Sequence, residues 1–145
     1  MLKIGHFKEY IKKLRTAGLR PTKQRLMISR ILFDKKETFH FTIEDLRKLV
    51  EKNFNKKISL ATVYNTVHVF KKKGYLKKIV VDGSKAYFDT NTSPHHHFYD
   101  EETEKLIDIK DSEISLNNLP NSPSGKFIKG VDVMVTLASD NHNHK

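Results

Sequence analysis

Between residues 59 and 73 the chain reads Ser59-Leu-Ala-Thr-Val-Tyr-Asn-Thr-Val-His-Val-Phe-Lys-Lys-Lys73, and this stretch decides the fold. Its apolar residues Val63, Val67 and Phe70 recur at i, i+4 and i+7, which is the spacing of one buried helix face. Ser59 suits the N-cap position, because its hydroxyl can accept a hydrogen bond from a first-turn backbone N–H. The opposite side of the expected helix is polar, aromatic and basic: Tyr64, Asn65, His68, Lys71 and Lys72.

That polar side has the chemistry of a surface that reads DNA. An α-helix fits the major groove, where Asn can pair with adenine and a Tyr ring can pack on a thymine methyl group. Asn65 and Tyr64 are therefore predicted to contact bases of an A·T-rich site. Ser59 and Thr62 lie in the first turn, where the helix N-terminus favours phosphate. The simpler alternative, a solvated helix face, stays open on this stretch alone.

The residues before and after this helix indicate a winged variant of the helix-turn-helix. A short amphipathic helix is expected over residues 7–14, ending at Gly18. Further helices are expected to begin at the N-cap Thr22 and at Thr42-Ile-Glu-Asp45, which resembles a capping box. Beyond Gly74 the period changes to that of a β-hairpin over residues 75–88, turning at Asp82-Gly83.

The second half predicts a small unit of short strands. We expect strands at residues 96–99 and 106–109, a loop at 119–125, and a strand at 131–137 with one buried face carrying Val131, Val133, Val135 and Leu137. Residues 141–145 are expected to fray. A unit of about 50 residues is hard to stabilise alone, so we expect it to bury its strands against a second copy. The chain is thus predicted to be α+β, with an N-terminal winged helix-turn-helix domain followed by a small α/β dimerisation domain.

The expected boundaries follow a split in charge. Residues 1–88 hold 22 Lys and Arg against 7 Asp and Glu, a net of +15, whereas residues 89–145 hold 5 against 10, a net of −5. A basic half is typical of a protein that binds a polyanion, although a lysine-rich genome is an alternative for any single Lys. We expect a DNA-binding domain at 1–88, a hinge at 89–94, a dimerisation and effector domain at 95–140, and a flexible tail at 141–145.

Basic residues outside the reading helix are candidates for the DNA backbone or the minor groove. They surround the start of the second helix or lie in the hairpin: Arg20, Lys23, Arg25, Lys77, Lys78 and Lys85. Together they predict a steep salt dependence, because each neutralised phosphate releases counterions.

Composition excludes several other classes of protein. The chain has no cysteine, which excludes disulfides, thiolate zinc sites and cysteine nucleophiles. No apolar run approaches the roughly 20 residues that span a bilayer, and the N-terminus has no signal-peptide core. We therefore expect a cytoplasmic protein with no membrane partner.

A histidine run marks a second candidate site. In a strand, His95 and His97 point one way and His96 the other. With carboxylates nearby and no sulfur, such a set suits Zn²⁺, Fe²⁺ or Mn²⁺, and a histidine run can also ligate haem. His40, before the third helix, could swing toward Asp89. A surface histidine run with no bound ion is the alternative.

Two other functions compete with a regulator. A metal-dependent hydrolase could use the His/Asp cluster, but no substrate pocket is marked and the basic helical domain would stay unexplained. A winged-helix architectural protein without an effector is the third possibility. We do not expect an enzyme.

Several motifs, in order and at sensible spacing across residues 15–137, resemble the ferric uptake regulator family. They are Leu19-Arg-Pro-Thr-Lys-Gln-Arg25, His40-Phe-Thr-Ile-Glu-Asp-Leu46, Ile58-Ser-Leu-Ala-Thr-Val-Tyr-Asn65, Gly83-Ser-Lys-Ala-Tyr-Phe-Asp89 and His95-His-His97. The resemblance implies a homodimeric, metal-responsive transcription regulator that binds two-fold operators on double-stranded DNA. By the same resemblance, Tyr64 and Asn65 match base-contacting positions, and Arg20 matches a basic residue of the minor groove.

The resemblance also implies ligands. The sensory site maps to His40, Asp89, His97 and Asp108, with Tyr99 where a further histidine often stands. A weaker second set maps to His96 and Asp132, with Phe98 in place of an acidic ligand. The family's structural zinc site of paired CxxC motifs is missing.

The most similar branch is that of the iron response regulators. Its members also lack the cysteine pairs and carry three histidines followed by aromatics, here Phe98 and Tyr99. A shortened region at 111–125, where other members have a longer helix, fits this branch. It implies iron sensing through haem, with His95, His96 and His97 involved.

Overall fold

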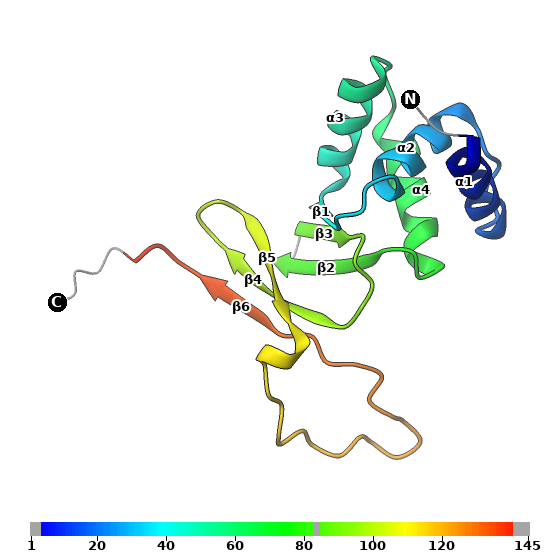
Figure 1. Ribbon diagram of the computed structural model, residues 1–145. Coiled ribbons are helices and arrows are strands. Elements are labelled where there is room, and N and C mark those ends of the chain that lie inside the picture. Colours follow the sequence, from blue (N-terminus) through cyan, green and yellow to red (C-terminus); the bar gives the residue numbers. More distant parts are fainter. Residues whose placement is uncertain (1–3, 83–84, 141–145) are drawn as a thin grey trace. The chain divides into compact units, whose positions relative to one another are not determined.

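The computed structural model describes residues 4–82 and 85–140. The chain divides into two compact units, Met1–Thr92 and Ser93–Lys145, and each is described by itself (Figure 1). The predicted class is confirmed: a winged helix-turn-helix unit precedes a small second unit built on a sheet.

The helices of the first unit begin and end at locally encoded signals. They are α1 (Ile4–Thr16), α2 (Lys23–Phe33), α3 (Ile43–Phe54) and α4 (Leu60–Lys72). The side chains of Thr22, Thr42 and Ser59 accept backbone N–H groups at the starts of α2, α3 and α4, as predicted. Gly18 and Gly74 follow α1 and α4 with φ of 82° and 83°, a left-handed conformation that favours glycine.

These helices pack around one apolar core. The predicted face of α4 lies in it, since Val63, Val67 and Phe70 are fully buried. The Lys13 ammonium of α1 lies over the rings of Phe33 and Tyr75, at 4.5 and 4.1 Å from their centroids. The helices therefore hold α4 by its apolar side and leave its polar side exposed.

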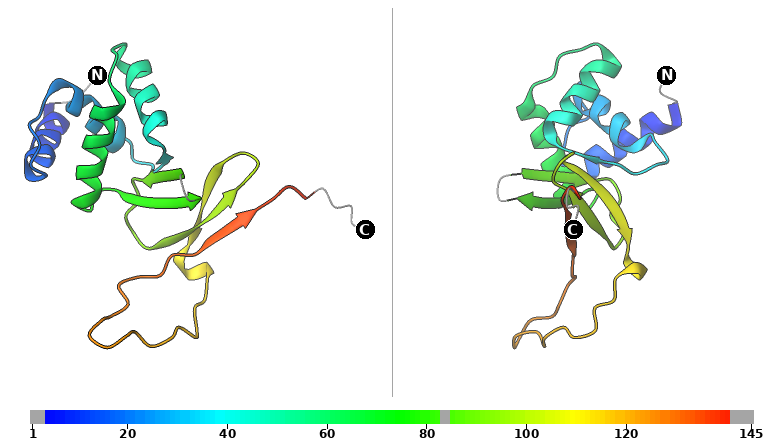
Figure 2. Two further views of the ribbon diagram at one scale, coloured as in Figure 1. Left: turned by 180° about the vertical axis from the view of Figure 1, so that it is seen from behind. Right: turned by 90° about the vertical axis from the view of Figure 1, so that its left-hand side faces the viewer.

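The wing is a three-stranded antiparallel sheet in the order β1-β3-β2, seen beside α4 in both views of Figure 2. Its strands are β1 (His40–Phe41), β2 (Lys77–Asp82) and β3 (Lys85–Asp89). The hairpin of β2 and β3 was predicted, and Gly83 of its expected turn lies outside the described residues. The structure adds β1, which pairs with β3 so that His40 faces Asp89.

The second unit is a three-stranded sheet in the order β5-β4-β6. It contains β4 (His95–Asp100), β5 (Lys105–Lys110) and β6 (Met134–Leu137), with one 3-10 turn at Asp111–Glu113. β4 pairs antiparallel with β5 and parallel with β6. The predicted strands at 96–99 and 106–109 are thus confirmed, with β4 in the centre.

The predicted strand at 131–137 is wrong in length and in burial. β6 begins only at Met134, and Val131 and Val135 are 36% and 37% exposed. As an edge strand, β6 has a ladder partner on one side only. The described residues leave Val131 and Val135 exposed and cover Val133 and Leu137 only in part. The expected tail at 141–145 lies outside the described residues. Within the described residues, no helix has the length and hydropathy to cross a bilayer.

Candidate metal centre and nucleic-acid interface

The exposed side of α4 presents the side chains that the sequence assigned to DNA bases. Tyr64 is 56% exposed, and Asn65 and His68 are exposed as well. The rings of Tyr64 and His68 stack, with centroids 5.8 Å apart and planes 6° from parallel. One turn of helix therefore carries a flat aromatic pair next to an amide, which suits contact with base edges and methyl groups.

The start of α4 is fixed by two local devices. The Ser59 hydroxyl accepts the Thr62 N–H at 3.1 Å, which caps the helix. The Glu51 carboxylate accepts the Ile58 N–H at 3.1 Å and contacts Arg47 at 2.8 Å. The Ile58 N–H, with Arg47 as a further cause, holds the pKa of Glu51 below its usual value. Glu51 therefore ties the turn before α4 back to α3.

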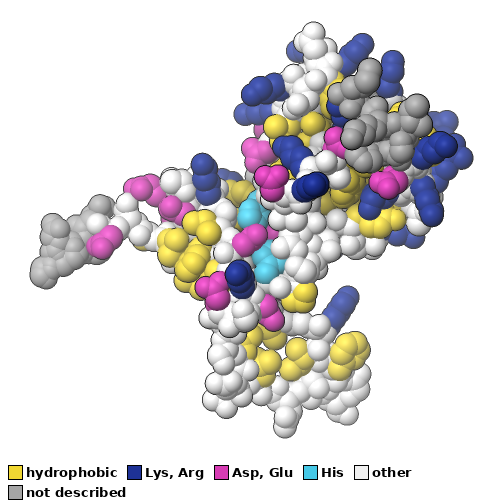
Figure 3. Space-filling view, viewed as in Figure 1, with side chains coloured by type: hydrophobic (Ala, Val, Ile, Leu, Met, Phe, Trp, Pro, Cys, Tyr) yellow, Lys and Arg dark blue, Asp and Glu magenta, His cyan; other side chains and the backbone are white. Residues whose placement is uncertain are grey.

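Basic side chains gather over the helical unit in Figure 3, in keeping with the charge split of the sequence. A hollow of about 520 Å³ between the end of α1 and the start of α2 is lined by Arg15, Gly18, Leu19, Arg20, Pro21 and Thr22. Arg20, Thr22 and Lys23 are exposed, and a guanidinium N–H of Arg25 donates to the Arg20 carbonyl at 3.1 Å. Lys72 ends α4 and Lys85 begins β3.

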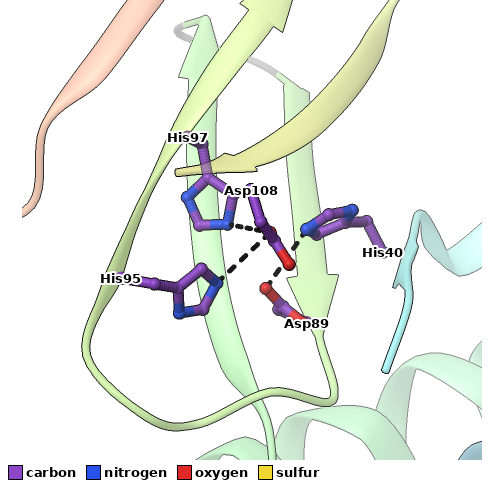
Figure 4. Close-up of side chains that lie close together, drawn as sticks. All are labelled: His40, Asp89, His95, His97 and Asp108. Atoms are coloured by element: carbon purple, nitrogen blue, oxygen red, sulfur yellow. Dashed lines mark ion pairs between the residues drawn. The ribbon is translucent and has the colours of Figure 1, made fainter. Parts of the chain in front are cut away.

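In the first unit, His40 and Asp89 form a first pair of candidate metal ligands, labelled in Figure 4. The Nε2 of His40 lies 3.2 Å from Oδ2 of Asp89, which is fully buried. The Asn91 N–H donates to the other oxygen, Oδ1, at 2.8 Å. The Asp89 carboxylate is therefore held in place by the backbone while Oδ2 faces the imidazole.

In the second unit, His95, His97 and Asp108 form a second group of candidate metal ligands, also labelled in Figure 4. His95 and His97 lie on one face of β4, and Asp108 is the partner of His97 in β5. Both Nε2 atoms lie close to Oδ1 of Asp108, His95 at 3.4 Å and His97 at 3.3 Å. Each of the three residues offers a ligand atom within 4.8 Å of the others.

The tautomer of His95 favours a cation at this half-site. The Ser93 carbonyl, which can only accept, lies 2.7 Å from Nδ1, so Nδ1 donates and carries the proton. In the neutral ring, Nε2 then presents its lone pair toward a carboxylate oxygen. This contact is repulsive unless a proton or a metal ion lies between the two atoms, and an oriented Nε2 is the usual form of a metal-binding histidine.

The structure brings the predicted sensory ligands together in two pairs. The expected His40 and Asp89 lie together in the first unit, and the expected His97 and Asp108 lie together in the second. His95 lies with His97, as their i, i+2 spacing in a strand predicted. The ligand set implied by the family resemblance had left His95 out and assigned it to haem.

The remaining expected ligands stay predictions. His96 is buried on the opposite face of β4, with Nε2 3.0 Å from Asp111, while its expected co-ligand Asp132 lies just before β6. Because side chains alternate along a strand, His96 lies on the face opposite His95 and His97. A haem site that used all three histidines would have to reach both faces of β4. Phe98 lies on the His96 face, and Tyr99 is buried on the other.

Comparisons with known proteins bear on the family and on the fold of this chain. The model of the ferric uptake regulator family matches residues 16–126. A peroxide-responsive repressor of Staphylococcus aureus is 36% identical over 102 residues, which is 70% of this chain and 67% of the relative.

Two solved structures support the fold. A manganese-containing ferric uptake regulator of Pseudomonas aeruginosa superposes with a TM-score of 0.65 at 24% identity, covering 90% of this chain and 98% of the other. The ferric uptake regulator of Vibrio cholerae superposes with a TM-score of 0.65 at 22% identity, covering 89% and 98%. At these identities the likeness shows the fold alone.

Proposed function

This chain belongs to the ferric uptake regulator family, and from that premise we propose that it is a metal-responsive transcriptional repressor that binds two-fold, A·T-rich DNA as a homodimer. The observation that carries the proposal is the half-site of His95, His97 and Asp108, whose oriented nitrogen atoms and carboxylate favour a bound cation. The exposed face of α4 and the basic charge of the first unit support the DNA-binding part.

We propose that one divalent ion joins the two half-sites. Five residues separate Asp89 from His95, so their Cα atoms can never lie farther apart than about 22 Å, whatever the arrangement of the units. An ion that takes His40 and Asp89 together with His95, His97 and Asp108 would have three imidazole and two carboxylate ligands. This donor set fits Fe²⁺, Mn²⁺ or Zn²⁺ and contains no sulfur.

Such an ion would act on the segment between the units. The proposed hinge at 89–94 carries Asp89 at one end and leads directly into His95 at the other. Binding both half-sites fixes the hinge, and so restricts the distance between the two α4 helices of a dimer. Because a two-fold operator presents its half-sites at a fixed spacing, this restriction raises DNA affinity. The boundaries 1–88 and 95–140 for the domains on either side belong to the same proposal.

The DNA-contacting residues proposed are those of α4, of the α1–α2 turn and of the wing. Tyr64 and Asn65 read bases, Arg20 enters the minor groove, and the others contact phosphates or support the surface: Thr22, Lys23, Arg25, Ser59, Thr62, His68, Lys72 and Lys85.

The effector is proposed to be an oxidant that acts on the metal-loaded protein. The relative from Staphylococcus aureus is named for its response to peroxide, and it supports this reading. The chain has no cysteine, so an oxidant response cannot use a thiol, and we propose that it acts at the metal centre. The relatives reported above do not support the iron-response-regulator branch, and haem binding by His95, His96 and His97 stays a prediction. Addition of haem with a check for a Soret band tests it directly.

DNA selection followed by titration tests the proposal. Duplexes enriched from a random pool by the Mn²⁺-loaded protein are expected to be A·T-rich with two-fold symmetry. Binding measured by fluorescence anisotropy should weaken steeply with salt and on chelation of the metal. The variant His97→Ala should lose the metal effect while it keeps the thermal stability of the metal-free protein. No selective enrichment, or equal affinity with and without metal, would overturn the proposal. For the effector, peroxide should release DNA from the Fe²⁺-loaded wild type.

A further inference from the structure

His96 lies between the two proposed ligands of β4 and faces the other way. Its side chain is 2% exposed, which makes it one of the most deeply buried polar groups of the chain. Its partner in β5 is Ile109, which is 6% exposed. A buried imidazole needs partners for both ring nitrogens, and the identity of those partners fixes what the ring can do.

The first ring nitrogen completes the junction of β4 with β6. The Val133 N–H donates to Nδ1 of His96 at 3.0 Å, and the Val133 carbonyl accepts the His97 N–H at 3.1 Å. The ladder between the two strands begins one step later, at His97 and Met134. The imidazole of His96 thus accepts the Val133 N–H just before the first paired residues of β4 and β6.

This hydrogen bond determines the tautomer. A ring nitrogen that accepts an N–H uses its lone pair, so the proton of neutral His96 is on Nε2. Nε2 lies 3.0 Å from Oδ1 of Asp111, although no group among the described residues completes a well-oriented hydrogen bond to it. A protonated Nε2 has no lone pair for a metal ion, and Nδ1 is occupied by the backbone.

The two contacts of the ring lie at the two ends of one long segment. Asp111 directly follows β5 and Val133 directly precedes β6, and the residues between them contain only the 3-10 turn as regular structure. Nδ1 holds the second end through the hydrogen bond from the Val133 N–H, whereas Nε2 only lies near the first end, at Asp111. β4 is thereby fixed at the end from which His95 projects to the other face.

We propose that His96 is a positioning residue of the metal centre and not one of its ligands. By accepting the Val133 N–H behind β4, it fixes the strand that carries His95 and His97 and so the direction of their Nε2 atoms. The inference rests on the proposed function in that the ion held by these two histidines is the one proposed above. It replaces the expected role of His96 in a second metal site with Asp132.

The tautomer can be read in the wild-type chain. Two-bond ¹H–¹⁵N correlation spectra of the full chain, uniformly ¹⁵N-labelled, should show His96 with its proton on Nε2 before any metal is added. Titration with Zn²⁺ should shift the ring nitrogens of His95 and His97 and leave those of His96 in the same pattern. A proton on Nδ1 of His96, or a zinc-induced shift of its Nε2 as large as that of His95, overturns the proposal.

A pair of variants tests the positioning role. His96→Phe keeps a planar ring but loses both contacts, and His96→Asn keeps an amide oxygen near the place of Nδ1. Loss of an outer-shell partner weakens metal binding by about 10- to 100-fold, so we expect His96→Phe to bind Zn²⁺ at least about ten-fold more weakly. His96→Asn should recover most of the affinity that His96→Phe loses, since it keeps the acceptor for Val133. Both variants should still bind one Zn²⁺ per chain, with the Co²⁺ absorption spectrum of the wild type.

Failure of the positioning role of His96 and failure of the proposed metal centre give different results in these experiments. Wild-type affinity in His96→Phe, or loss of bound metal in His96→Asn without loss of fold, contradicts the positioning role. The control His95→Ala removes a proposed ligand and should lose binding outright. If the wild type itself binds neither Zn²⁺ nor Co²⁺, the proposed metal centre fails, whereas the spectrum without metal still decides the tautomer of His96.

Discussion

His40 and Asp89 face each other across the β1–β3 pair, with Nε2 of the histidine 3.2 Å from Oδ2 of the carboxylate. The pairing is backed by Thr90, whose hydroxyl accepts the Phe39 N–H and whose own N–H donates to the Phe39 carbonyl. The wing sheet thus sets one half of the proposed metal centre, so the same strands that complete the proposed DNA-binding domain also carry proposed ligands.

Replacement of the buried Asp89 should abolish the dependence of DNA binding on metal. Asp89→Asn keeps the shape of the side chain and an acceptor for the Asn91 N–H, but it removes the charge that favours a cation. We expect Mn²⁺ affinity to fall by at least about ten-fold, and the metal-dependent gain in DNA affinity to be lost. Isothermal titration and anisotropy measure the two effects. The control Glu37→Gln changes an exposed acid of the same unit and should leave both unchanged.

The two residues proposed to read bases, Asn65 and Tyr64, should affect sequence preference more than stability. Asn65→Ala removes an exposed amide, so we expect a loss of about 1–3 kcal/mol of discrimination at one base pair and an unchanged melting temperature. Tyr64→Ala should relax preference at a neighbouring pair. Repeating the DNA selection with each variant checks this. A uniform loss of affinity across all sequences would instead assign these side chains to the DNA backbone.

Lys72 should contribute to affinity without contributing to selectivity. It is exposed at the end of α4 and its charge suits a phosphate. Lys72→Ala is expected to weaken all duplexes alike and to reduce the slope of log affinity against log salt by about one. An unchanged slope would show that this lysine neutralises no phosphate in the complex.

The contacts of the Glu51 carboxylate with the Ile58 N–H and with Arg47 should give the first unit a component of stability that depends on pH. The pKa of Glu51 is lowered from 4.5 by the Ile58 N–H and then by Arg47, so its contribution is complete above pH 4.5 and is lost as the pH falls through the lowered value. The melting temperature of Glu51→Gln should therefore lie below that of the wild type at neutral pH, and the difference should shrink in acid. Glu44→Gln removes another partner of Arg47 but leaves Ile58 bound, and it should show the smaller change.

The helices could be predicted because their signals are local. Thr22, Thr42 and Ser59 cap helices that begin at the next residue, and each cap involves a backbone group only three residues away. The apolar spacing of α4 similarly fixes its buried face without knowledge of what covers it. Its exposed face follows from the same period, so the candidate DNA surface could also be predicted.

Long-range pairing could not be predicted in the same way. The sequence placed His40 in a turn, whereas it forms β1 with a partner 49 positions along the chain. Nothing within a few residues of His40 encodes that pairing. The predicted start of β6 was wrong for a related reason. The alternation of Val131, Val133 and Val135 shows which side chains share a face, but it does not show where the hydrogen-bonded ladder begins.

The uncovered face of the second unit should be where two chains meet. Phe98 is paired with Ile107 on one side and Val135 on the other, so these side chains form one row across the sheet. Ile107 and Val135 are 50% and 37% exposed, although burial of such side chains is worth about 1.5–3 kcal/mol each. A second copy offers an equal apolar row to cover it, which is the self-complementary contact of a two-fold dimer.

A charge in this row should therefore dissociate the dimer. Val135→Glu places a carboxylate in the contact, and we expect it to sediment as a monomer at concentrations where the wild type is a dimer. It should also bind a two-fold duplex no better than a half-site duplex, since the gain from joining two reading helices is lost. Thr136→Glu, one residue along β6 on the other face, should remain dimeric. Dimeric Val135→Glu would place the contact between copies elsewhere.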